Sequence, residues 1–147
     1  MPPLPIDWQL LGITAVKLAA AYVLSLPMGW SGEKEGHSVG IRTFPIVAIA
    51  SCGYLLIFND LTGADGLAAK SRLLQGLVTG IGFVGGGAIV RDGINVHGTA
   101  TAASIWNTGA IGAAVAMGKY EVAIVLSVLN LITLRGLVRL KKRIDDQ

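Results

Sequence analysis

The segment at residues 73–90 contains eighteen residues, of which six are glycine and none is charged. In water this segment would form a poor helix, because each interior glycine costs about 1 kcal/mol relative to alanine. In a lipid bilayer an unpaired backbone group costs more, so a helix is the local structure open to the segment. Glycine there allows another helix to approach to backbone contact. The segment is therefore predicted to be a closely packed membrane helix.

The composition of the whole chain also favours a membrane environment. Of its 147 residues, 52% are hydrophobic and only 14% are charged, whereas a soluble domain carries about 25% charged residues. Cys52 is the only cysteine, which excludes a disulfide within the chain. We expect an all-α, polytopic membrane protein, with one transmembrane domain over residues 1–140 and a basic cytoplasmic tail over residues 141–147.

Apolar segments recur along the chain at lengths that suit a bilayer. At about 1.5 Å per residue, each crosses or nearly crosses a hydrocarbon core of about 30 Å. Five transmembrane helices are predicted, at residues 8–30, 41–58, 73–90, 99–117 and 120–138.

Lysine and arginine are unequally divided between the two sides that five spans would create. Three lie on the side of the N-terminus, namely Lys70, Arg72 and Lys119. Eight lie on the other side, namely Lys34, Arg42, Arg91, Arg135, Arg139, Lys141, Lys142 and Arg143. Because cytoplasmic segments are enriched in basic residues, the N-terminus is predicted to be outside and the C-terminus in the cytoplasm.

On a helical wheel, the small residues of the glycine-rich segment share one arc. This arc is predicted to face protein, with the aliphatic arc facing lipid. The expected helix-packing residues are Gly76, Gly80, Gly82, Gly86 and Gly87, with Thr79 among them and Gly85 on the aliphatic side. A second interpretation is that these glycines expose backbone carbonyls to an ion or small solute.

The predicted span at residues 99–117 carries a polar stripe formed by Thr101, Ser104, Asn107 and Thr108. Such a stripe can hydrogen-bond a neighbouring helix, at about 0.6 kcal/mol per contact. It could equally line a hydrated cleft. Both interpretations remain open on the sequence alone.

Lys17 is the one charge near the middle of a predicted span. A lysine at that depth costs about 2.5–3.5 kcal/mol on insertion scales. The helix could tolerate it, with the side chain extending part of the way out. Alternatively the amine turns inward, toward backbone carbonyls or a carboxylate; the available carboxylates are Glu33, Asp60, Asp92 and Glu121.

The connector at residues 91–98 is short and rich in functional groups, with Arg91, Asp92, Asn95 and His97. A single histidine with one aspartate is weak evidence for a metal site, so a solvated turn is the favoured interpretation and no metal site is defined. The sequence has no nucleophile–base pair, phosphate-binding glycine loop or metalloprotease spacing. We therefore expect no enzymatic activity and no cofactor. Nucleic-acid binding is also not expected, because the basic patch at the C-terminal end belongs to a chain that is apolar elsewhere.

The residues from Gly80 to Ile89, followed by Arg91 and the residues from Val96 to Trp106, resemble the MgtC/SapB family of bacterial membrane proteins. The string Gly40-Ile41-Arg42-Thr43 is similar to that family's Gly-Leu-Arg-Thr. Arg72 falls where the family has an arginine, and Lys17 where a basic residue is common in the first span.

Two features depart from the family pattern. The family has Glu-Arg-Glu at the end of the first span, where this chain has Ser31-Gly32-Glu33. Its best-known members also carry a soluble C-terminal domain after the fifth span, so a short form without this module is expected here.

The resemblance implies an inner-membrane protein connected with magnesium limitation, with membrane energetics and, in pathogens, with survival inside host cells. Three hypotheses follow. The chain could act without catalysis by docking against another membrane protein, such as an ion-motive ATPase. It could be a transporter or channel for Mg²⁺ or another small solute. It could also be a self-associating scaffold that forms homo-oligomers in the bilayer.

Overall fold

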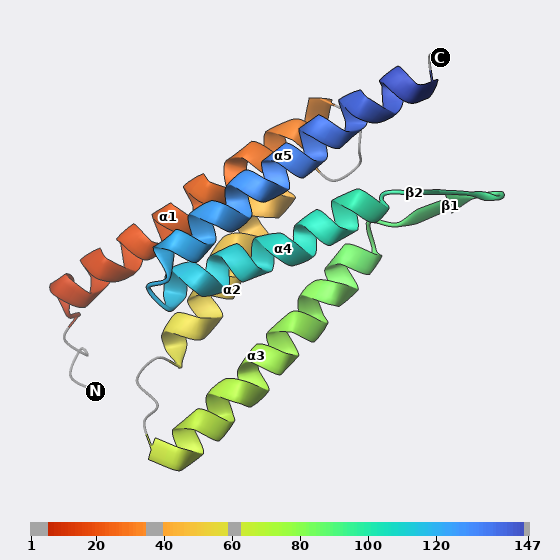
Figure 1. The fold of residues 1–147 in the computed structure, drawn as a ribbon. Coiled ribbons are helices and arrows are strands. Elements are labelled where there is room, and N and C mark those ends of the chain that lie inside the picture. Colours follow the sequence, from red (N-terminus) through yellow and green to blue (C-terminus); the bar gives the residue numbers. More distant parts are fainter. Residues whose placement is uncertain (1–5, 35–39, 59–62, 146–147) are drawn as a thin grey trace.

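The computed structural model describes residues 6–34, 40–58 and 63–145, and side chains within these at 6–30, 40–58 and 66–135. It has five helices: α1 (Trp8–Lys34), α2 (Thr43–Ile57), α3 (Gly63–Gly86), α4 (Thr99–Ala116) and α5 (Tyr120–Asp145). Two short strands, β1 (Val90–Asp92) and β2 (Asn95–His97), join α3 to α4. The chain is thus helical as predicted, except for a hairpin where a turn was expected (Figure 1).

Helices α3 and α5 differ most from the predicted spans. Helix α3 begins at Gly63 and ends at Gly86, so it starts before residue 73 and stops before residue 90. Past its end, the amides of Ala88 and Ile89 donate to the carbonyls of Gly85 and Gly86 at 3.0 and 3.1 Å. This tighter i→i+3 pattern ends the helix. Helix α5 runs to Asp145, so residues 141–145 of the predicted tail continue the helix, as lysine and arginine readily do.

Helix α4 lies at the centre of the bundle and packs against the other four helices. Helices α1, α3 and α5 run in one direction, and α2 and α4 run in the other (Figure 1). Where α4 crosses α2, a methyl group at Gly112 would collide with the carbonyl oxygen of Ala48. Glycine at this position is what allows the two backbones to approach so closely.

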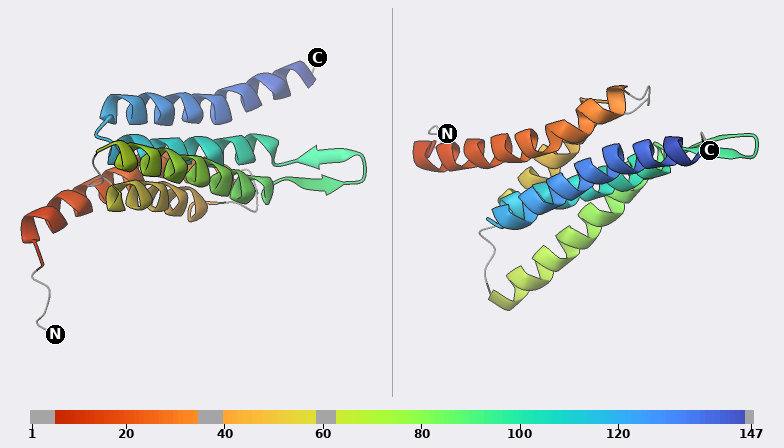
Figure 2. Two further views of the ribbon diagram at one scale, coloured as in Figure 1. Left: turned by 90° about the horizontal axis from the view of Figure 1, so that it is seen from below. Right: turned by 45° about the horizontal axis from the view of Figure 1, so that its top comes forward.

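Helix α3 is the element least integrated into the bundle. It packs mainly against α4 and makes few contacts with α2. Its C-terminal end lies close to α4, and its N-terminal end diverges from the rest of the bundle (Figures 1 and 2). The divergence leaves part of α2 and part of α3 facing each other without close contact.

The hairpin between α3 and α4 projects beyond the end of the bundle (Figure 2). Its strands are antiparallel, with Asp92 opposite Asn95. Gly93 has φ of +59°, and a glycine at the first of two turn residues is typical of a type II′ turn. Ile94, the second turn residue, is 94% exposed at the tip.

Large apolar side chains lie on the surface of the bundle as well as in its core. Large apolar side chains are exposed on every helix, for example Val23, Ile46, Phe83, Trp106 and Leu129. Monomeric soluble proteins rarely expose contiguous apolar patches larger than a few hundred Å². The buried side chains are mainly small or polar ones and include Ser25, Ser51, Ser104, Thr108 and Ser127.

Among the described helices, one is both long and apolar enough to cross a membrane, and it covers Trp8–Trp30 of α1. Helix α2 is a shorter apolar helix. The structure thus contains one helix that meets the requirements of a span on length and composition alone.

Candidate functional site

Lys17 connects helix α1 to the C-terminal end of helix α4. Its Nζ donates a hydrogen bond to the carbonyl oxygen of Ala116 at 3.0 Å. The last carbonyls of a helix lack partners within the helix and carry partial negative charge, so a cation stabilises them. Of the carboxylates considered for Lys17, Asp60 and the side chain of Glu33 lie outside the described residues.

The contact with Ala116 also changes the expected depth of Lys17. Helix α4 has eighteen residues, a length of about 27 Å that is close to the thickness of a hydrocarbon core. Lys17 is therefore placed at one end of the central helix, whereas counting along the first span had placed it near the middle. The difference arises because the N-terminal end of α1 extends past the C-terminal end of α4 (Figure 1).

The polar stripe of α4 is packed against other helices. Asn130 on α5 donates to the Ser104 hydroxyl at 2.9 Å. Asn107 donates to the Leu126 carbonyl of α5 at 3.3 Å. Thr108 bonds within its own helix, to the Ser104 carbonyl at 2.8 Å. These three contacts are the helix-to-helix and intrahelical bonds expected of packing residues.

Two further members of the polar interior extend the same pattern. Thr101 is buried, with 6% of its surface exposed. Ser127 on α5 donates to the Leu24 carbonyl of α1 at 2.6 Å. Helices α1, α4 and α5 are therefore joined by side-chain hydrogen bonds to one another, and these bonds use the polar groups that could otherwise have lined a cleft.

The predicted helix-packing glycines of α3 make no close contact with the other described helices, so packing of this arc against protein stays a prediction. At Gly76, Gly80, Gly82 and Gly86 an added methyl group would meet no described atom within 4 Å. At Gly87 it would meet only backbone of the preceding turn, 3.3 Å from the Val84 carbonyl oxygen.

The opposite side of α3 makes the contact with α4. A methyl group at Gly85 would lie 3.0 Å from the Ala102 carbonyl oxygen. The Ile81 side chain fills the space beside Gly109 of α4, where a methyl group would collide with it. The aliphatic arc was predicted to face lipid, but Ile81 on this arc packs against α4, because α4 supplies the glycine and α3 can present an aliphatic side chain.

The remaining charged candidates lie at two ends of the bundle. Arg42 is exposed at the position before α2 and makes no side-chain cap. Arg91 and Asp92 are exposed in the hairpin, where the Arg91 Nε donates to the Gly93 carbonyl at 3.0 Å. Arg72 is exposed on α3, toward the opposite end. These residues do not converge on one site.

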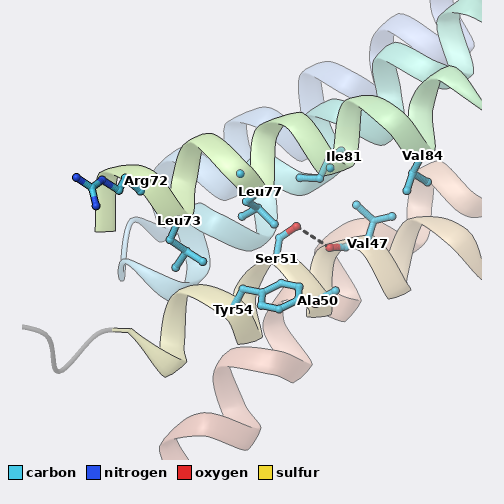
Figure 3. Close-up of a pocket in the computed structure, with 11 residues that line it drawn as sticks. Val47, Ala50, Ser51, Tyr54, Arg72, Leu73, Leu77, Ile81 and Val84 are labelled. Carbon is cyan, nitrogen blue, oxygen red and sulfur yellow. Dashed lines mark hydrogen bonds between the residues drawn. The ribbon is translucent and has the colours of Figure 1, made fainter. Parts of the chain in front are cut away.

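A groove between α2 and α3 is the feature that sequence reasoning missed. It has a volume of about 550 Å³ and follows from the divergence of α3. Its α2 wall consists of Val47, Ala50, Ser51 and Tyr54, and its α3 wall of Arg72, Leu73, Gly76, Leu77, Gly80, Ile81 and Val84 (Figure 3). A second, smaller groove of about 280 Å³ lies on the other side of α3, with Trp106 and Lys119 among its lining residues.

Metal-ligating residues do not gather in the structure. Among the side chains described at residues 6–30, 40–58 and 66–135, no group of three from His, Cys, Asp or Glu could hold an ion. Within the same ranges, His97 lies in the exposed hairpin and Cys52 is buried in α2.

The structure is a helical bundle with an exposed apolar surface, buried polar side chains that bond between and within helices, and a first helix long enough to cross a membrane. These features define the class of membrane-associated helical proteins. Within that class, this chain belongs to the MgtC family, whose model matches residues 18–143.

Several curated proteins are similar to the chain. Protein SrpB of Synechococcus elongatus is 33% identical over 92% of this chain and 79% of its own length. Protein MgtC of Brucella abortus is 33% identical over 90% of this chain, which spans 54% of that protein. The Escherichia coli K12 protein named "Putative magnesium transporter YhiD" is 31% identical over 90% of this chain and 64% of its own length. No solved structure matches the chain.

Proposed function

We propose that this chain is a polytopic inner-membrane protein in which all five helices cross the bilayer. The exposed apolar side chains on every helix support this, because lipid is the solvent that such a surface suits. The buried serines and threonines support it too, because interhelical hydrogen bonds and close approach by small residues drive helix association in lipid.

The proposed orientation places the hairpin and the C-terminus in the cytoplasm. Arg42 and Arg91 lie toward the hairpin end of the bundle, together with the basic C-terminal end of α5. Lys17 and Lys119 lie toward the other end, beside the turn between α4 and α5. Adding Lys17 to the outer side leaves the cytoplasmic side the more basic, as the positive-inside rule requires.

We further propose that the protein is a non-enzymatic factor that acts on another membrane protein during magnesium limitation. The observation that carries this proposal is the outward face of α3. At Gly82 and Gly86 a side chain would meet no described atom within 4 Å, and Phe83 between them is 85% exposed. A small-residue face is the surface against which a second helix packs most closely in lipid. An ion-motive ATPase is one candidate partner, and a second copy of this chain is another.

A pull-down from detergent tests this proposal. Gly86→Leu adds a bulky side chain on the outward face of α3, where an added Cβ meets no described atom within 4 Å, so it should remove the partner and the growth phenotype at low magnesium. Gly12→Leu is the matched control, because Gly12 on α1 also has open space. Unchanged partners and unchanged growth for Gly86→Leu would contradict the proposal.

Transport of Mg²⁺ or another small solute is the competing function, and the name of the Escherichia coli relative favours it. It has less support from the residues. Mg²⁺ is usually held by carboxylates and retains several waters, whereas Lys17 and the polar stripe are engaged in contacts between helices. Flux into sealed vesicles is the deciding measurement: Mg²⁺ uptake that Lys17→Met abolishes would replace the docking proposal.

A further inference from the structure

The groove between α2 and α3 has the dimensions of one leaflet of a bilayer. Its residues on α3 run from Arg72 to Val84, which is twelve helical steps or about 18 Å. Half of a hydrocarbon core is about 15 Å. The volume of about 550 Å³ also falls within the usual range for small-molecule sites, about 300–1,000 Å³.

The walls of the groove are apolar along this length. Leu73, Leu77 and Val84 project from α3 and Val47 from α2 (Figure 3). The one serine on the wall donates its hydroxyl hydrogen to the Val47 carbonyl at 2.8 Å and is 1% exposed. The groove therefore offers hydrocarbon contact along its length, and the Ser51 hydroxyl is not available to an occupant.

Two glycines give the groove its depth. Gly76 and Gly80 both line it, and at each of them a methyl group would meet no described atom within 4 Å. Side chains at these positions would occupy the groove itself. The space beside them is thus open to an occupant from outside the chain.

A cation lies at one end of this apolar groove. Arg72 lines one end of the groove, and its guanidinium points outward from the other labelled lining residues (Figure 3). Tyr54 also lines the groove and is 53% exposed. Leu74, two residues from Arg72, lines the neighbouring groove together with Met117 and Lys119. Arg72 is therefore level with the turn between α4 and α5, where a bilayer has its phosphate groups.

The charge and the apolar walls together fit one kind of molecule. Guanidinium binds phosphate through two parallel hydrogen bonds, and tyrosine prefers the headgroup level. We propose that the α2–α3 groove binds an anionic phospholipid, with an acyl chain along the groove and the phosphate on Arg72. This inference rests on the proposed membrane location but not on the proposed partner.

Native mass spectrometry of the full chain released from detergent tests the site, with phosphatidylglycerol and phosphatidylcholine as probes. Wild-type protein should retain phosphatidylglycerol in preference. Arg72→Gln should weaken phosphatidylglycerol binding about tenfold, since it removes a charged hydrogen-bonding partner. Arg91→Gln, which changes an arginine in the hairpin, should leave binding unchanged.

A matched pair of glycine variants tests the groove separately from the charge. Gly80→Leu should fill the groove and reduce binding of both lipids, whereas Gly82→Leu, which also meets open space but does not line the groove, should not. As a check on folding, added phosphatidylglycerol should raise the thermal midpoint of wild type and of Gly82→Leu but not of Gly80→Leu.

Two results would overturn the inference. One is that wild-type protein retains the two lipids equally and that Arg72→Gln does not change this retention. The other is unchanged lipid binding in Gly80→Leu with a loss of dimer, which would make a second copy of the chain the occupant. If Gly86→Leu loses its partner but still binds lipid, the lipid proposal holds independently of the partner proposal. The lipid proposal also holds if the pull-down finds no partner and lipid binding is intact.

Discussion

Among single side chains, Lys17 has the clearest structural role. A lysine in an apolar helix would be costly if it faced lipid, but its amine meets the Ala116 carbonyl where α4 ends. The contact joins two helices that are distant in sequence and satisfies a carbonyl that α4 itself cannot. Lys17 thus acts as a C-terminal cap provided by another helix.

Replacing Lys17 tests this role. Lys17→Met should lower the free energy of unfolding in detergent by about 1.5–3 kcal/mol, the usual contribution of a hydrogen bond to a charged group. Lys17→Arg keeps the charge and donors and should retain most of the stability. Thermal unfolding followed by circular dichroism gives the measurement. A Lys17→Met protein as stable as wild type would show that the cap contributes nothing.

The contact between Ser104 and Asn130 is a second single-residue feature, and it joins α4 to α5. In lipid such a bond contributes about 0.6 kcal/mol. A double-mutant cycle with Ser104→Ala and Asn130→Ala should give a coupling energy of that size in the free energy of unfolding. Additive effects of the two substitutions would mean that the two side chains do not interact in solution.

At the level of helices, glycine has two different uses in this protein. On α4 it permits close approach, since Gly112 and Gly109 lie directly against α2 and α3. On α3, open space surrounds Gly76, Gly80, Gly82 and Gly86. The same residue type therefore packs the bundle in one helix and opens a surface or a groove in the other.

A pair of alanine substitutions separates the two uses. Gly112→Ala should destabilise the bundle by about 1–3 kcal/mol, because its methyl group would overlap the backbone of α2. Gly53→Ala on α2 meets open space and should stabilise its helix by up to about 1 kcal/mol. Chemical denaturation in detergent compares the two. Equal effects of the two substitutions would contradict the packing at the α2–α4 crossing.

For the molecule as a whole, five helices of alternating direction place the hairpin and the α4–α5 turn at opposite ends. If all five cross the membrane, these two connections are on different sides. The hairpin tip at Ile94 and the turn at Lys119 are both exposed, so each can be labelled.

Single-cysteine labelling tests the proposed topology. In a Cys52→Ser background, Lys119→Cys should react with an impermeant maleimide in intact cells. Ile94→Cys should react only after the inner membrane is made permeable. The reverse pattern would invert the orientation, and reaction of both in intact cells would contradict five spans.

Much of the helical organisation could be predicted from the sequence, because apolar segments and their polar connectors are local features. The facing of α3 could not. Both arcs of that helix are free of charge, and the contact depends on Gly109 in another helix. The hairpin did leave a local signal, since the turn glycine Gly93 is followed by alternating apolar and polar residues that end at His97. The groove arises from the angle of α3, which no local pattern encodes.

The way α3 is attached has a mechanical consequence. Helices α1, α2, α4 and α5 hold one another through several faces, whereas α3 is held chiefly along one side of α4. Of all the helices it can change its tilt with the smallest loss of internal contacts. A change in the surroundings of this protein would therefore first alter the tilt of α3 relative to the other four helices.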